Sequence, residues 1–180
     1  MRTSGRILVL TALLFATSIY ALDPPHAAAP CTTIIVVRHA EQTDPNASDP
    51  PLSEAGAARA NALAAAVEHS GVQAIYVTQF KRTKDTAAPA AALLHAPVTE
   101  VPVEKAMLSD HAPALAKRIL SEHPGRTVLV VGHSNTVPSI VEALSGVKIK
   151  AIDHAEFDRF VVVTAGAKGC SHVLRAQYGH

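Results

Sequence analysis

The sequence predicts one α/β domain, a three-layer α/β/α sandwich whose mostly parallel central sheet ends in a C-terminal antiparallel hairpin. Two continuous apolar runs, Thr32–Val37 and Thr127–Val131, are typical of strands that helices bury on both faces. Segments with helical periodicity alternate with short apolar segments along most of the chain, which favours a parallel sheet. The 180 residues suffice for one core and give no reason to expect a second folded domain.

The individual elements follow from local signals. Ser53 is a good N-cap for a helix that runs to about Glu68, because its hydroxyl can accept a backbone N–H of the first turn. The later elements, in chain order, are a strand over 73–78, a helix from Gln79 that Pro89 kinks or restarts, a strand over Val98–Val101, a helix capped by Ser109 or Asp110 with Pro113 in its first turn, the strand Thr127–Val131, a helix with Pro138 in its first turn, and a hairpin of Phe160–Thr164 and His172–Tyr178.

The N-terminus has the residue order of a secretory signal peptide. Two arginines precede the apolar run Ile7–Ala16, and Ala27–Ala29 supplies small residues. The apolar stretch is short for a membrane-spanning helix, which needs about 20 residues. We therefore predict a signal peptide over residues 1–29, cut after Ala29 or near Ala21, and a periplasmic or secreted protein without stable membrane insertion after signal removal. An uncleaved anchor is the alternative.

The net charge of the chain is too small to predict binding to nucleic acid or to an anionic membrane surface. The chain has 16 Lys and Arg against 15 Asp and Glu, a formal charge of +1. The two cysteines, Cys31 and Cys170, could form one disulfide outside the cytoplasm, tying the first strand to a turn near the C-terminus. Two free thiols are the alternative, and their separation is not that of a metal site. The sequence does not predict an oligomeric state.

Two buried strands each end in a histidine, which is the chain's strongest functional signal. Arg38 and His39 follow one strand, and His133 follows the other. In a parallel sheet both histidines lie at the carboxyl edge, where ligands bind, and Arg82 can reach the same crevice after the strand over 73–78. Two arginines and two histidines at one point predict an anionic ligand, because guanidinium groups match phosphate oxygens in a bidentate way.

Four segments resemble signatures of the histidine phosphatase superfamily, which includes phosphoglycerate mutases, phosphohistidine phosphatases and acid phosphatases. In chain order they are Arg38–Glu41, similar to Arg-His-Gly; Leu52–Gly56, similar to Leu-Thr-Glu-x-Gly; Thr78–Ala87, similar to Ser-x-x-x-Arg-x-x-x-Thr-Ala; and Val131–Ser134, similar to the Gly-His-Ser/Gly box. Ala40 in place of Gly and Thr78 in place of Ser are mild departures. The resemblance implies a phosphoglycerate mutase-like fold for a single domain over residues 30–180.

The resemblance also implies roles for individual side chains. His39 would attack phosphorus and become a phosphohistidine, so its ring must be neutral with one nitrogen free. No metal or other cofactor would be needed, since the arginines supply the positive charge that phosphoryl transfer requires. The residues expected to bind the substrate are Arg38, Arg82, His133, Ser134 and Glu41.

The proton donor to the leaving group has no clear match in the sequence. The family takes it from an acidic residue between the second arginine and the second histidine, and both Asp110 and Glu104 fall in that interval. We assign the role to Asp110, which could instead simply cap a helix. Glu104, or no acid at all, are the alternatives.

These observations predict a metal-independent phosphomonoester hydrolase that forms a covalent phosphohistidine on His39. Its partner would be a phosphorylated small molecule or a glycan. One alternative is a binding module that holds a phosphoryl ligand without turning it over, because the acid is missing. Another is a phosphohistidine phosphatase or mutase-type transfer enzyme, although the domain has no long insertion to enclose a substrate during re-phosphorylation.

Overall fold

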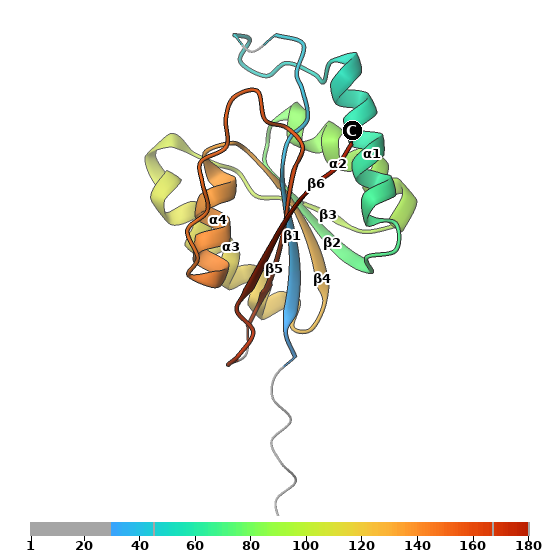
Figure 1. The fold of residues 1–180 in the computed structure, drawn as a ribbon. Helices are drawn as coiled ribbons and strands as arrows, with labels where there is room; N and C mark the ends of the chain where they lie inside the picture. Colours follow the sequence, from blue (N-terminus) through green and yellow to red (C-terminus); the bar gives the residue numbers. More distant parts are fainter. Residues whose placement is uncertain (1–29, 45, 167, 180) are drawn as a thin grey trace, which may run out of the picture.

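The structure, a computed structural model, describes residues 30–44, 46–166 and 168–179. The predicted signal peptide therefore lies outside the described residues. The described part is built on one six-stranded sheet with the strand order β3-β2-β4-β1-β5-β6 (Figure 1). The strands are β1 (Thr32–Arg38), β2 (Val72–Val77), β3 (Val98–Glu100), β4 (Thr127–Gly132), β5 (Arg159–Ala165) and β6 (His172–Gln177).

The sheet is parallel from β3 to β1 and antiparallel beyond it. β1 pairs with β4 in parallel and with β5 in antiparallel orientation, and β5 and β6 form an antiparallel hairpin. Four helices cover the sheet, two on each face: α1 (Glu54–Val67) and α2 (Lys81–Leu94) on one, α3 (Leu108–Glu122) and α4 (Thr136–Ser145) on the other (Figure 1). This arrangement confirms the predicted fold class.

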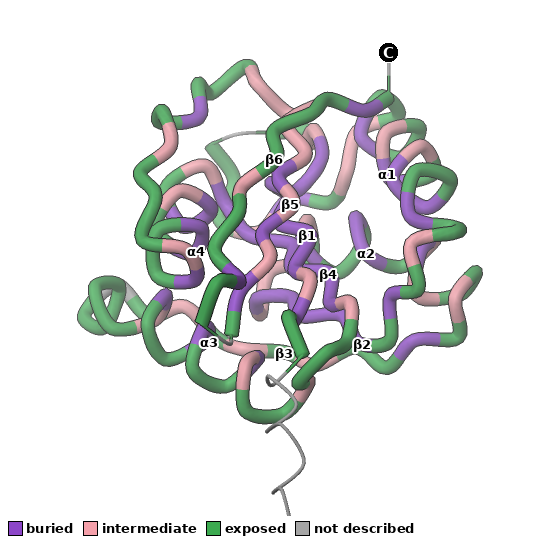
Figure 2. The backbone as a smooth tube through the Cα atoms, turned by 60° about the horizontal axis from the view of Figure 1, so that its bottom comes forward, coloured by how far each residue is buried: buried purple, intermediate pink, exposed green. Residues whose placement is uncertain are grey.

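The central strands are apolar throughout because each face of the sheet has its own core. Along β1, Ile34 and Val36 pack into the cluster under α3 and α4, whereas Ile35 and Val37 pack into the cluster under α1 and α2. Burying each such side chain is worth about 1.5–3 kcal/mol. Figure 2 shows the result: the central strands are buried, while exposed residues follow the outer sides of the helices.

One prediction about a helix end was wrong. Neither Ser109 nor Asp110 caps α3, because a short 3₁₀ turn, η1 (Lys105–Met107), leads directly into a helix that already begins at Leu108. Pro113 consequently lies in the second turn of α3. Of the two alternatives for Pro89, a kink or a restart, the restart is excluded, because α2 continues as one helix from Lys81 to Leu94. The predicted cap at Ser53 is confirmed, since its hydroxyl accepts the N–H of Gly56.

A disulfide joins Cys31 to Cys170, with the two Cα atoms 5.5 Å apart, so the bonded pair rather than two free thiols is present. It links the residue before β1 to the turn before β6, at the amino end of β1. The sequence separation is 139 residues, so the bond closes almost the whole domain into one loop. Such a long loop restricts the unfolded chain strongly.

Replacing both cysteines, as Cys31→Ser with Cys170→Ser, should lower the free energy of unfolding by about 2–5 kcal/mol. Urea denaturation of residues 30–180 would measure it. The unsubstituted protein in excess reductant is the control and should match the variant. Equal stability of the oxidised protein, the reduced protein and the variant would contradict this account.

Candidate active site

The pairing of β1 with β4 brings the two predicted histidines together. Arg38 and Gly132 are register partners at the ends of these strands, and His39 and His133 follow them directly. Their ring centroids lie 5.3 Å apart. Arg82 enters from the first turn of α2, and the same pocket of about 800 Å³ is lined by all four predicted residues together with Ser134 and Glu41. A single phosphate can therefore contact both histidines.

His39 has the ionisation state that a nucleophile requires. Its Nδ1 lies 2.8 Å from the carbonyl oxygen of Ala40, which can only accept a hydrogen bond. The neutral ring therefore carries its proton on Nδ1 and leaves the Nε2 lone pair free. Burial, together with the charges of Arg38 and Arg82, lowers the pKa of His39 to about 4. The ring is consequently neutral near pH 7.

The backbone around His39 is held from two sides. The N–H of His39 donates to the carbonyl of Gly132 on β4 at 2.9 Å. The N–H of Ala40 donates to the hydroxyl of Thr86, which in turn donates to the carbonyl of Arg82 at 2.6 Å. Thr86 is fully buried. A single threonine on α2 thus fixes the loop of His39 relative to the helix turn that carries Arg82.

His133 is fixed through buried threonine hydroxyls. Its Nε2 lies 3.0 Å from the hydroxyl oxygen of Thr78, which lies 3.0 Å from that of Thr83. Burial lowers the pKa of His133 to about 3, with smaller contributions from His39 and the two arginines. His133 is therefore also neutral near pH 7, and its ring plane is set by Thr78.

Gly132 is required by the close packing of α4 on the strand end. A Cβ at this position would lie 2.8 Å from the hydroxyl oxygen of Thr136 and 3.3 Å from a methyl carbon of Val137. That same Thr136 hydroxyl accepts the N–H of His133 at 2.8 Å. A larger residue at 132 would therefore disturb the backbone that presents His133.

Arg38 is anchored along one side of its guanidinium and open along another. Its Nη1 donates to three backbone carbonyls of the 150–158 loop, each at 2.9 Å. The guanidinium carbon lies 3.9 Å from the ring centroid of Phe157. Its Nε is buried and has no hydrogen-bond partner among the described residues. The donors that the carbonyls do not take up belong to a guanidinium that lines the pocket.

Arg82 is stacked in a similar way. Its guanidinium carbon lies 4.2 Å from the ring centroid of Phe80, and its nearest carboxylate oxygen, on Asp49, is 3.9 Å away. Burial lowers the pKa of Arg82 and of Arg38 from the usual arginine value. Arginine still stays protonated in proteins. Both cations are therefore partly desolvated, which favours binding of an anion.

Glu41 lines the pocket, but its carboxylate is engaged by the protein. Both carboxylate oxygens accept from Nε of Arg59, at 2.8 and 2.9 Å, and Arg59 also donates to the carbonyl of Tyr178 near the C-terminus. A Cβ at Gly56 would overlap the Glu41 carbonyl oxygen, which explains that glycine. The role of Glu41 in substrate binding stays a prediction.

Asp110 and Glu104 lie outside this pocket. Both are exposed and line a neighbouring hollow of about 350 Å³ between α3 and the segment after β3. Among the described residues that line the larger pocket, Glu41 is the one carboxylate. The structure therefore does not bring Asp110 to His39, and its assignment as proton donor stays an untested prediction. Among all the residues that the structure describes, no group of three or more His, Cys, Asp or Glu side chains could hold a metal ion.

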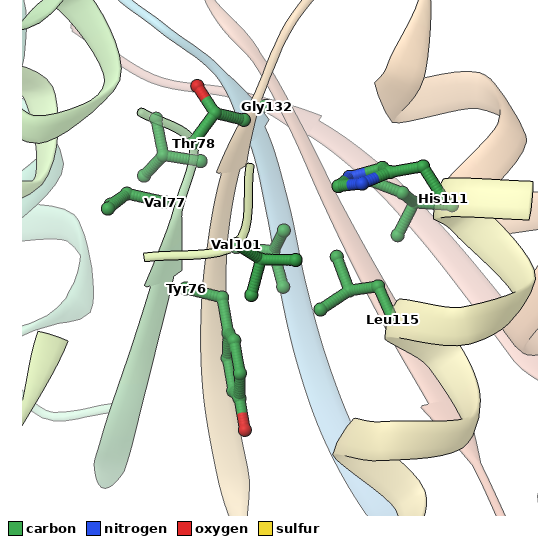
Figure 3. Close-up of a pocket in the computed structure, with 10 residues that line it drawn as sticks. Tyr76, Val77, Thr78, Val101, His111, Leu115 and Gly132 are labelled. Atoms are coloured by element: carbon green, nitrogen blue, oxygen red, sulfur yellow. The ribbon is translucent and has the colours of Figure 1, made fainter. Parts of the chain in front are cut away.

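A small cavity lies behind the site, between the strand ends and α3. His111 and Leu115 line it from α3, Tyr76, Val77 and Thr78 from β2 and its end, and Val101 from the segment after β3 (Figure 3). Its volume is about 10 Å³, room for one water at most. Burial lowers the pKa of His111, which lies at its edge. The cavity is a packing defect of the apolar core rather than a ligand site.

Several pocket residues were missed by sequence reasoning. Phe80 lies inside the matched segment Thr78–Ala87, so its position was available, but nothing about it indicated that it packs under Arg82. Phe157 and His154 come from the 150–158 loop, which carries no motif. The loop contacts Arg38 through backbone carbonyls, and such contacts leave no signal in residue type.

The family model of the histidine phosphatase superfamily, branch 1, matches residues 34–103, a range that contains Arg38, His39 and Arg82 and ends before His133. No curated protein sequence matches the chain. Among solved structures, the phosphoglycerate mutase from Bacillus anthracis is similar at a TM-score of 0.65 and 15% identity, over 84% of this chain and 94% of that one.

Two solved phosphatases have a similar fold. The mycobacterial glucosyl-3-phosphoglycerate phosphatase matches at a TM-score of 0.63 and 13% identity, over 83% of this chain and 99% of that one. The phosphoserine phosphatase from Entamoeba histolytica matches at a TM-score of 0.60 and 13% identity, over 83% of this chain and 97% of that one. The chain therefore has the α/β fold of phosphoglycerate mutase-like structures.

The low pKa values of His39 and His133 predict a pH-dependent stability. Both pKa values fall below the usual histidine value of 6.5, so between about pH 6.5 and 4 the unfolded chain binds more protons than the folded protein does. The free energy of unfolding should therefore decrease as the pH falls through that window. The double variant His39→Asn, His133→Asn should show a shallower decrease in urea denaturation from pH 7 to 4.5. The exposed His69→Asn is the control. An unchanged slope in the double variant would refute the assignment.

Proposed function

We propose that this protein is a histidine phosphatase, a phosphomonoester hydrolase that works through a covalent phosphohistidine on His39. The observation that carries the proposal is the free Nε2 of a buried, neutral His39 in one pocket with Arg38, Arg82 and His133. The order of the matched segments and the likeness to solved phosphatases support it. The substrate would be a phosphorylated small molecule or a glycan.

The proposed reaction has two steps. His39 Nε2 attacks phosphorus in line with the leaving oxygen, while Arg38, Arg82 and His133 hold the three equatorial oxygens and stabilise their charge. Nδ1 keeps its proton and donates it in the hydrogen bond to the Ala40 carbonyl, so the phosphorylated ring can form without losing its orientation. Water then attacks the phosphohistidine and releases phosphate.

The proton for the leaving group is assigned to Asp110 only as a hypothesis. Its place in the neighbouring hollow gives that assignment no support, and the carboxylate of Glu41 is held by Arg59. The lack of a free carboxylate among the described lining residues favours a second candidate function. That second function is a binding module, in which the same pocket binds a phosphorylated ligand without hydrolysing it.

We also propose that the protein is exported. The N-terminal pattern of basic, apolar and small residues is the main support, and the Cys31–Cys170 disulfide suits an oxidising compartment. Among the residues that the structure describes, no helix is long and apolar enough to cross a membrane.

Residues 30–180 should hydrolyse p-nitrophenyl phosphate, whose leaving group needs no protonation. His39→Ala should lower the rate by on the order of a thousandfold or more, because the nucleophile is lost. Release of p-nitrophenol is followed by absorbance. If the unsubstituted protein binds inorganic phosphate but releases no p-nitrophenol above the His39→Ala background, the binding module replaces the enzyme.

The assignment of Asp110 has a separate test. If Asp110 is the acid, Asp110→Asn should slow hydrolysis of phenyl phosphate, a poorer leaving group, by about tenfold or more and leave p-nitrophenyl phosphate unaffected. Glu104→Gln, which removes a carboxylate from the same hollow, is the matched control. A full rate for Asp110→Asn on both esters would overturn the assignment.

A further inference from the structure

The pocket extends well beyond the space that one phosphate fills. Its volume is about 800 Å³, within the range of sites that enclose whole small molecules. The apolar part of its wall comes from four segments that are far apart in the sequence. It consists of Ala47, Phe80, Val103, Leu108, Ala155 and Phe157.

Among the described lining side chains, the permanently positive ones belong to the group that would bind phosphate. Among the described lining residues, the permanently charged side chains are Arg38, Arg82 and Glu41, and Glu41 is neutralised by Arg59. Both arginines belong to the set that would hold the phosphoryl oxygens. Among the lining residues whose side chains the structure describes, no further Lys or Arg is left to pair with a second anion on the part of the substrate that lies against the apolar wall.

The apolar wall is held in place by specific contacts. The side-chain amide of Gln79 donates to the carbonyl of Val103 at 3.0 Å and accepts its N–H at 2.9 Å, which fixes the segment after β3. Phe157 packs under Arg38 and Phe80 under Arg82. Phe80 also lies edge-on to His133, with centroids 5.4 Å apart. The wall is thus organised before any substrate binds.

We propose that this pocket selects phosphomonoesters whose leaving group is uncharged and largely apolar, and that it discriminates against leaving groups that carry a carboxylate or a second phosphate. The inference rests on the proposed phosphatase function. A carboxylate against this wall would lose water without gaining a cation, whereas an apolar group would gain contact area.

A matched pair of aryl esters tests the proposal: 4-ethylphenyl phosphate and 4-(carboxymethyl)phenyl phosphate. The methylene separates the carboxylate from the ring, so the two phenols are similar leaving groups and the pair differs mainly in charge. The unsubstituted protein should show a kcat/KM at least about tenfold higher for the ethyl ester, as expected for burial of an unpaired charge. A ratio near one, or a preference for the carboxylate, would overturn the inference.

Two neighbouring substitutions test whether the wall itself makes the distinction. Leu108 lines the pocket and is 39% exposed, so Leu108→Lys should fold and place a cation where the carboxylate would lie. This variant should reduce the ethyl-to-carboxymethyl ratio several-fold, and Leu108→Asp should increase it. Met107 is 56% exposed and lines the neighbouring hollow, so Met107→Lys adds the same charge one residue away and should leave the ratio unchanged.

The outcomes separate this inference from the function on which it rests. If the unsubstituted protein hydrolyses neither ester nor p-nitrophenyl phosphate, the phosphatase proposal and the substrate class fall together. If it hydrolyses both esters equally, the phosphatase proposal stands and the substrate class is wrong. If Leu108→Lys and Met107→Lys shift the ratio alike, the distinction comes from the overall field of the protein rather than from this wall, which also overturns the inference.

Discussion

The parallel pairing of β1 with β4 is the constraint on which the candidate site depends. Because Arg38 and Gly132 are register partners, His39 and His133 leave the sheet side by side, and the N–H of His39 donates to the Gly132 carbonyl. Apolar side chains on both faces of the two strands fix this register, since a slip by one residue would exchange the faces of every side chain. The cores on the two faces of the sheet thus determine the spacing of the two rings.

Burial at the carboxyl edge of the sheet removes the charge of the two histidines but not that of the two arginines. Desolvation makes both histidines neutral, which is the state that the proposed mechanism requires of His39 as nucleophile and of His133 as an uncharged hydrogen-bonding partner. The arginines stay charged, and their stacking on Phe80 and Phe157 replaces part of the lost water. The pocket therefore presents two partly desolvated arginine cations, and a phosphoryl group would supply oxygen acceptors for them.

Sequence reasoning located the parts of the site that depend on residue type and missed those that depend on backbone contacts. The two apolar runs predicted β1 and β4 and, with them, the convergence of His39 and His133. The 150–158 loop was missed because it holds Arg38 through carbonyl oxygens, which every residue has. The pairing of Glu41 with Arg59 crosses two elements, so no local pattern could reveal it.

The central claim, that His39 Nε2 is the nucleophile of a phosphoryl-transfer site, is tested most directly by a crystal structure with orthovanadate. Vanadate mimics the trigonal-bipyramidal transition state and binds tightly where that state is stabilised. The account predicts vanadium bonded to His39 Nε2, with its equatorial oxygens within about 3 Å of Arg38, Arg82 and His133. Vanadate bonded to another residue, or held without any contact to His39, would contradict it.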